Sequence, residues 1–125
     1  MEGRKAVGEQ GEALARHYLR HCGFTILETN ARFGHHEVDI IARDKKEIVF
    51  VEVKTRSGAQ FGTPEASVTS RKIRNLEQAL ATYLNRHPSI AAARIDVVAI
   101  YFTEGRKPRL KHFRSVGEGQ LVFLS

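Results

Sequence analysis

Two neighbouring runs of this chain combine the composition of buried β-strands with acidic side chains, and this combination limits the fold more than any other feature. The runs are residues 37–41 and 48–54, both rich in β-branched and apolar residues. Side chains alternate along a strand, so Glu37 and Asp39 share one face of the first run. Glu52 and Lys54 likewise share one face of the second. Each strand therefore has a charged face and an apolar face.

The segment between the two runs is short and polar, so we expect the strands to fold back as an antiparallel hairpin. A turn centred on residues 45–46 places Asp39 directly opposite Glu52. It also places Glu37 opposite Lys54. Directly opposed side chains have Cβ atoms roughly 4.5–5.5 Å apart, and like charges at that separation are destabilising. A cation is therefore expected between Asp39 and Glu52.

A divalent metal ion is the natural cation for this position. Carboxylates are hard oxygen ligands, and Mg²⁺ needs only one or two of them beside water and substrate phosphate. We therefore expect Mg²⁺ or Mn²⁺ at Asp39 and Glu52, with Lys54 placed for a phosphate or a nucleophilic water. The alternative is that the acids simply face solvent, since acid-x-Lys alone recurs by chance. The hairpin register favours the metal site, because charged residues rarely stay on a core strand without partners.

An acid, a spacer of about a dozen residues and then acid-x-Lys form the core motif of the PD-(D/E)xK nucleases, which this sequence resembles. Further segments look like the bacterial YraN family, a family considered related to the archaeal Holliday-junction resolvases. These segments are Gly8-x-x-Gly11-Glu12, 37–41, 50–56, Phe61-Gly62 and 94–100. His36 stands where the family usually has Gly, and Val38 stands in place of the proline of the superfamily's name.

The resemblance implies one restriction-endonuclease-like α/β domain over residues 1–125, with a mixed central sheet flanked by helices. It implies a metal-dependent endonuclease that hydrolyses phosphodiester bonds in nucleic acid, most naturally DNA and including branched DNA such as Holliday junctions. Asp39, Glu52 and Lys54 would be catalytic, and Glu12 would complete the metal site from the first helix. A homodimer is also compatible, because cutting two strands symmetrically needs two sites.

Two further acids have roles that the residues alone leave open. Glu12 lies seven positions before Leu19, nearly two helical turns, so it lies at the margin of an apolar stripe and looks toward the sheet. The alternative is an ordinary solvated acid at a helix edge. Glu37 is either a third acid of the site or an ion-pair partner that holds Lys54 in place.

The remaining elements follow from apolar periodicity and end signals. We expect a helix over 8–22 stopped by Gly23, a strand over 24–28, a turn at Asn30, a loop over 57–64, a helix from Thr69 or Ser70 to His87, and a central strand over 94–102. Strands interrupted by helices of this length indicate a mixed sheet with helices on its faces. Asp96, among apolar strand residues, is interpreted as structural and paired with Arg94 or a loop donor.

Composition is compatible with a polyanionic partner. The chain has 20 Lys and Arg against 14 Asp and Glu, a formal charge of +6. Its one cysteine, Cys22, cannot form an internal disulfide and is expected on the apolar face of the first helix. No apolar run approaches membrane-spanning length, so a cytoplasmic protein without a membrane partner is expected.

Basic side chains beyond the hairpin are candidates for nucleic-acid binding. They are Arg56, Arg71, Lys72, Arg74 and the basic run over residues 106–114. Such phosphate contacts give affinity without reading sequence. For Lys72 the simpler account is a stem that snorkels beside the second helix's stripe, and for the terminal run it is a solvated face. Two rival functions remain: a non-catalytic nucleic-acid-binding module that keeps the nuclease fold, and a structural partner protein that uses the sheet edge.

Overall fold

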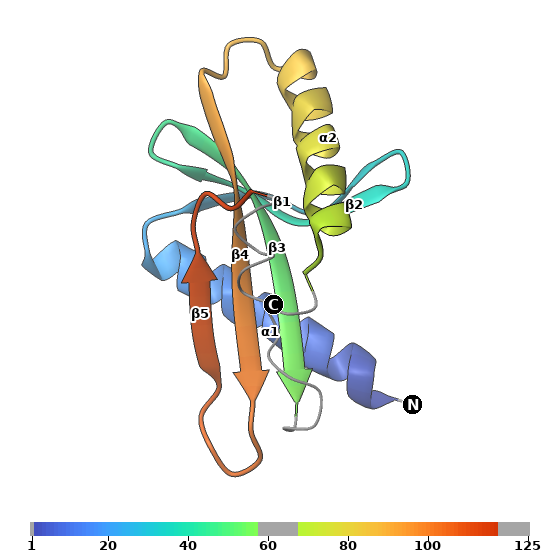
Figure 1. Ribbon diagram of the computed structural model, residues 1–125. Coiled ribbons are helices and arrows are strands. Elements are labelled where there is room, and N and C mark those ends of the chain that lie inside the picture. The colour runs from blue at the N-terminus through green and yellow to red at the C-terminus, as the bar shows by residue number, and fades with distance from the viewer. Residues whose placement is uncertain (1, 58–67, 118–125) are drawn as a thin grey trace.

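The computed structural model describes residues 2–57 and 68–117, and within them two helices enclose one five-stranded sheet (Figure 1). The elements are α1 (Glu2–His21), β1 (Thr25–Phe33), β2 (His36–Asp44), β3 (Glu47–Ser57), α2 (Ser70–Arg86), β4 (Ala92–Phe102) and β5 (Arg109–Phe113). No helix of the described residues is long and apolar enough to cross a membrane.

The sheet is mixed, as the sequence predicted. Its strand order is β1-β2-β3-β4-β5, and the neighbours pair antiparallel except for β3 and β4, which run parallel. A parallel pair cannot be joined by a tight turn, so the chain returns through α2 before it enters β4. The predicted α/β class with helices on a mixed central sheet is confirmed.

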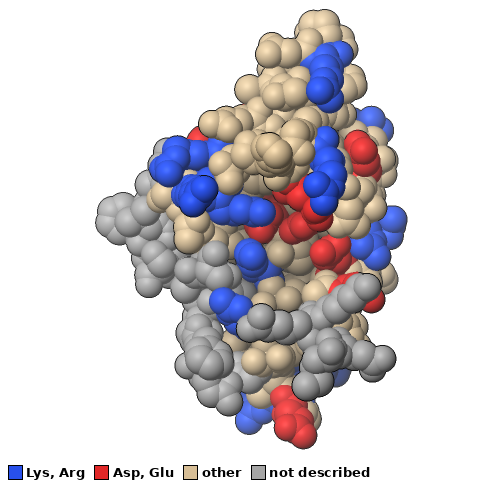
Figure 2. Space-filling view, turned by 90° about the vertical axis from the view of Figure 1, so that its right-hand side faces the viewer, with Lys and Arg blue, Asp and Glu red and all other residues tan. Residues whose placement is uncertain are grey.

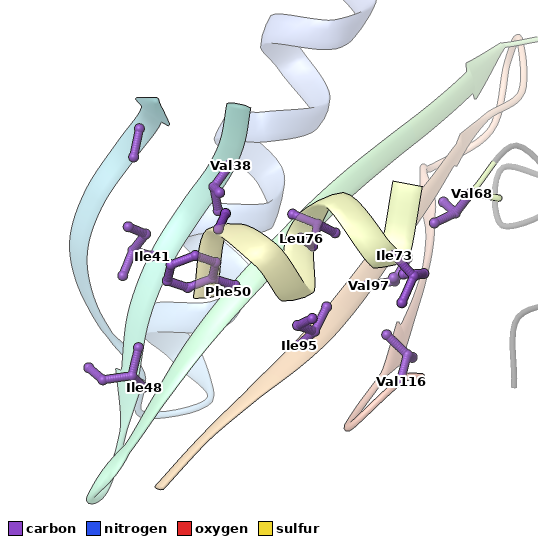
Figure 3. Packing of buried hydrophobic residues seen from close by; sticks show 12 residues of the cluster. Val38, Ile41, Ile48, Phe50, Val68, Ile73, Leu76, Ile95, Val97 and Val116 are labelled. Carbon is purple, nitrogen blue, oxygen red and sulfur yellow. The ribbon is translucent and has the colours of Figure 1, made fainter. Parts of the chain in front are cut away.

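Each helix covers one face of the sheet, and each face has its own hydrophobic core. Ile73 and Leu76 of α2 belong to one cluster with Phe50 and Val97, and Figure 3 shows Ile73 beside Val97. On the opposite face, Ala15 and Leu19 of α1 pack in a second cluster against the sheet. Its other buried members are Phe24, Ile40, Ala42, Val49, Val51, Val53, Val98 and Ile100. The alternation of β3 between these two clusters places Glu52 on the face that α2 covers.

The first helix is longer than predicted, and its end is as predicted. It begins at Glu2 rather than near Gly8. At its C-terminus Gly23 has φ +95°, and the N–H of Phe24 bonds the carbonyl of Leu19 at 2.9 Å. The expectation of a buried Cys22 is wrong: the thiol is exposed, because the helix ends at His21 and the chain turns away before the stripe reaches it.

The predicted turn at Asn30 is wrong, because β1 continues through it to Phe33. Asn30 takes a left-handed φ of +52° inside the strand, a conformation that Asn tolerates better than most residues. The reversal comes later, at Gly34 with φ +63°. Phe33 then packs against Phe50, which extends β1 along the whole of β2. The predicted loop over 57–64 lies outside the described residues, apart from Ser57 at the end of β3.

The structural role predicted for Asp96 is confirmed. Its carboxylate has no exposed surface and accepts hydrogen bonds from Arg94 Nε at 3.0 Å and from the backbone N–H of Ser115 at 3.0 Å. His112 Nε2 lies 2.8 Å from the same carboxylate. His112 belongs to β5, an edge strand within the basic run over residues 106–114, which the sequence left as a binding surface or a solvated face. Arg109 and Lys111 of this strand are exposed, while Leu110, His112 and Phe113 are partly buried, so the run is a strand with one packed side.

Candidate metal centre

The hairpin of β2 and β3 has the register that its sequence predicted. Ile40 pairs with Val51 and Asp44 with Glu47, so the turn is centred on residues 45–46. The described ladder ends at Ile40 and Val51, immediately before the two acids. Beyond this point a side chain accepts the hydrogen bond of the next strand N–H: Asp39 Oδ2 accepts a 2.7 Å hydrogen bond from the N–H of Val53.

Glu37 lies outside this junction. The predicted opposition of Glu37 and Lys54 does not form, because the β2–β3 ladder stops before it reaches them. Glu37 is exposed, pairs across the sheet with Arg32 of β1 and lies 3.7 Å from its guanidinium. Its role as an ion-pair partner of Lys54 is therefore corrected to a surface contact within the first hairpin.

Glu52 is the most unusual side chain of the site. Only 3% of it is exposed, and its Oε1 has no hydrogen-bond partner. Burial and then the neighbouring Asp39 carboxylate raise the pKa of Glu52 to about 8, and Lys72 and Lys54 only partly offset them. Burial also raises the pKa of Asp39, against the hydrogen bond from Val53. The protein thus keeps two adjacent acids where their ionisation is unfavourable.

One lysine lies near each oxygen of the Glu52 carboxylate. Lys54 Nζ is 3.8 Å from Oε2, and Lys72 Nζ is 3.8 Å from Oε1. Both distances exceed hydrogen-bonding range, so neither ammonium satisfies the buried acid. The sequence assigned Lys72 to the binding surface or to simple snorkelling. Its spacing to Leu76 and Ala79 was the signal that it faces the sheet.

Glu12 lies near the two acids without joining them in one cluster. Burial and then the charge of Asp39 raise the pKa of Glu12. Within residues 2–57 and 68–117, however, no three His, Cys, Asp or Glu side chains are close enough to hold one metal ion together. The structure therefore brings Asp39 and Glu52 together, and Glu12 stays a prediction as a third ligand.

The donor set at Asp39 and Glu52 fits a divalent cation. Its members are two carboxylates, the ligand type that Mg²⁺ and Mn²⁺ prefer, and Mg²⁺ requires only one or two of them. The Glu52 Oε1 atom is buried and without a hydrogen bond, a costly state that a bound cation would relieve. A bound cation would also lower the raised pKa of Glu52, because a nearby positive charge favours the ionised form of a carboxyl group.

Further basic side chains follow Lys54 along β3 and accompany Lys72 at the start of α2. Figure 2 shows acidic side chains gathered near the middle of one face, with Lys and Arg side chains beside them. Arg56 follows Lys54 on the same face of β3, and its buried Nε has no hydrogen-bond partner. Arg71 and Arg74 are exposed on the first turns of α2.

The sequence matches a described protein family over most of its length. The model of "Uncharacterised protein family UPF0102" matches residues 11–100. A UPF0102 protein of Geobacter metallireducens is 44% identical over 115 residues, which cover 91% of this chain and 93% of the relative. A UPF0102 protein of Beutenbergia cavernae is 41% identical over 118 residues, which cover 94% of this chain and 100% of the relative.

One solved structure is similar over nearly the whole chain. It is a Holliday junction resolvase, Hjc, of Archaeoglobus fulgidus, which aligns with a TM-score of 0.47 and 16% sequence identity. The alignment covers 92% of this chain and 92% of the resolvase chain.

Proposed function

The chain belongs to the UPF0102 family, and from the chemistry of its paired carboxylates we propose that it is a divalent-metal-dependent endonuclease that hydrolyses phosphodiester bonds in DNA. The observation that carries this proposal is the buried Glu52 beside Asp39, with a pKa raised to about 8. Strongly perturbed acids of this kind cluster at functional sites. The acid-x-Lys spacing to Lys54 gives the pair the pattern of a PD-(D/E)xK nuclease.

In this proposal Asp39 and Glu52 hold Mg²⁺ or Mn²⁺. When bound, the ion would supply Lewis-acid polarisation of the phosphate and a more acidic water. The hydrogen bond from Val53 fixes the Asp39 carboxylate against β3, so this ligand is oriented before substrate arrives. Glu12, whose pKa the Asp39 charge already raises, is the candidate for a further ligand or a proton acceptor.

Lys54 acts on the substrate. Its side chain is 36% exposed and its Nζ lies 3.8 Å from Glu52, so it can contact a ligand at the site. It would hold the attacking water and donate to a non-bridging phosphate oxygen as charge develops there. Water would then add to phosphorus and lose a proton to Glu12 or to solvent, while one bridging P–O bond breaks and the departing oxygen takes up a proton from solvent.

The surrounding basic side chains support nucleic acid as the substrate. The buried Nε of Arg56 has no hydrogen-bond partner, and Arg71 and Arg74 are exposed at the start of α2. Phosphates along a strand are the anions that such a set recognises without reading sequence. A homodimer would place one site on each of two DNA strands. A reducing, cytoplasmic location fits the exposed free thiol of Cys22.

The proposal is tested by cleavage of labelled DNA. Wild type and Asp39→Asn are incubated with single-stranded, duplex, flap and four-way-junction DNA in Mg²⁺, in Mn²⁺ and in chelator. We expect wild-type cleavage only with metal, and a loss of about 100-fold or more in Asp39→Asn, because it removes a ligand charge. The substrate that is cut fastest identifies the preferred DNA structure.

A matched control separates this result from a general charge effect. Glu28→Gln removes one negative charge from an exposed position on β1 and should cleave as the wild type does. Equal cleavage by Asp39→Asn and wild type would refute the assignment of the site. Tight DNA binding without cleavage in either metal would instead support the non-catalytic binding module.

A further inference from the structure

The start of α2 has a charge pattern that helix electrostatics disfavour. Arg71 and Lys72 lie in its first turn, Arg74 follows, and the first turn contains no acid. The positive end of the helix dipole favours acids at this end and cations at the other. A cationic helix start is therefore poorly explained by the stability of α2 alone.

Lys72 is held firmly in this turn. The side chain of Thr69 caps the helix by accepting a 3.2 Å hydrogen bond from the backbone N–H of Lys72. Ile73 and Leu76, the next residues of the buried stripe, have 0% and 1% of their surface exposed. The Lys72 stem therefore projects toward Glu52 from a backbone that the core fixes.

The ammonium of Lys72 remains accessible to a ligand. Its side chain is 35% exposed, close to the 36% of Lys54. It also borders a pocket between the β1–β2 turn and α2, which is lined by His35, His36, Glu37, Lys72, Asn75 and Leu76. Lys72 thus lies near Glu52 and also borders open space.

The role of a simple counter-ion for Glu52 does not account for both lysines. A counter-ion for a buried carboxylate gains most when it donates a hydrogen bond at about 2.7–2.9 Å. Neither lysine does so, since both nitrogens stay 3.8 Å away. Because neither ammonium is held in a hydrogen bond to Glu52, both keep donors that an anion placed between them could accept.

We propose that Lys72 is a second substrate-binding lysine of the site, and that a phosphate of the nucleic-acid backbone binds between Lys54 of β3 and Lys72 of α2. This inference rests on the proposed function, and it adds a catalytic group that the acid-x-Lys motif does not contain. The first turn of α2 then forms one wall of the substrate channel. Arg71 extends the same wall toward a neighbouring phosphate.

The test uses Lys72→Met, which keeps the apolar stem and removes the charge. The first readout is affinity for duplex DNA in chelator across a range of salt concentrations. We expect the log–log slope to fall by about one and the affinity to weaken for every sequence, because one phosphate contact is lost. Lys46→Met, at an exposed position in the β2–β3 turn, is the matched control and should leave the slope unchanged.

The second readout is cleavage in saturating Mn²⁺. Lys72→Met should lower kcat by about 100-fold, as when a donor to a developing oxyanion is removed, and Lys72→Arg should recover the salt slope and part of kcat. A lysine that only supports the fold would lower the melting temperature and leave slope and kcat unchanged, which would overturn the inference. If the wild type cuts no DNA, the proposed function fails, and the salt slope in chelator still decides the role of Lys72.

Discussion

At the scale of single residues, the site is defined by Glu52, an acid whose buried position makes its ionised form unfavourable. Glu52 could be satisfied by a hydrogen bond from either neighbouring lysine, yet its Oε1 has none. A buried carboxyl of this kind usually shifts its pKa and takes up a proton. The expected state of the metal-free protein at neutral pH is therefore a protonated Glu52 beside Asp39.

This state predicts how stability depends on pH. The pKa of Glu52 is raised from 4.5 to about 8 on folding, so the folded chain binds the proton more tightly than the unfolded chain. In chelator, the contribution of Glu52 to the free energy of unfolding should be largest below pH 4.5. It should decrease as the pH rises toward about 8. Urea unfolding across this interval measures the slope, and Glu52→Gln should flatten it.

Metal should reverse that trend. Ligand carboxylates bind metal in their ionised form, so the stabilisation by Mn²⁺ should grow as pH rises. Glu28→Gln serves as the exposed control and should keep both the slope and the response to metal. Parallel pH curves for wild type and Glu52→Gln, together with no effect of Mn²⁺, would mean that Glu52 is neither perturbed nor a ligand.

At the scale of elements, α1 approaches β3 closely at the residue before Glu12. A Cβ added at Gly11 would overlap the methyl carbon of Thr55 and lie 3.3 Å from its Cβ. At Gly8, one turn earlier, nothing lies within 4 Å. Gly11 is therefore needed for packing, and it precedes Glu12, whose place near Asp39 depends on the same contact.

The two glycines predict opposite effects of the same substitution. Gly8→Ala should stabilise the protein by about 0.5–1 kcal/mol, because Ala is the better helix former. Gly11→Ala should destabilise it by roughly 1–3 kcal/mol, because a stiff β-branched side chain must move. Thr55→Ser removes that methyl group and should recover most of the loss in the double variant. Chemical denaturation compares the wild type, Gly8→Ala, Gly11→Ala and the Gly11→Ala, Thr55→Ser double variant. Equal stabilisation by Gly8→Ala and Gly11→Ala would contradict the close contact.

The elements also show how far the sequence alone reaches. The β2–β3 hairpin and α2 were predictable because their signals are local: alternation around a polar turn, and a Thr69 cap with Pro88 beyond the end. Strand β5 was missed because its basic side chains hide a weak alternation, and its pairing with β4 is a tertiary contact. The ion pair of Lys72 with Glu52 was missed for a similar reason, since α2 comes near β3 only through the crossover.

At the scale of the whole molecule, a second buried acid has the opposite environment. Burial alone would raise the pKa of Asp96, but hydrogen bonds from His112 and Arg94 outweigh it and the pKa is lowered. Arg94 also bonds Asp44 and Glu47 beside the β2–β3 turn, at 2.8 and 2.9 Å. This network joins β5, β4 and the hairpin, so the sheet is held together by charges distinct from those of the site.

The contrast predicts different outcomes for the two acids. Asp96→Asn should destabilise the protein by roughly 3–5 kcal/mol, because it breaks a buried pair and leaves charges without a partner. Because the lowered pKa keeps Asp96 ionised, the stability it adds should be present above pH 3.8 and should be lost as pH falls below that value. Urea denaturation of both proteins measures the difference. A loss under about 1 kcal/mol would show that the network contributes little.

The parallel pairing of β3 with β4 has a consequence for the time order of folding. Asp39 and Glu52 belong to one hairpin, a local structure, whereas β4 arrives only after the α2 crossover. Local contacts form faster than long-range parallel ones. We therefore expect the two carboxylates to meet while water still surrounds them, when their repulsion is screened and their ionisation ordinary. Dehydration of Glu52 comes with the docking of α2 and β4, so the cost of burying this acid weakens the finished sheet without hindering the early collapse.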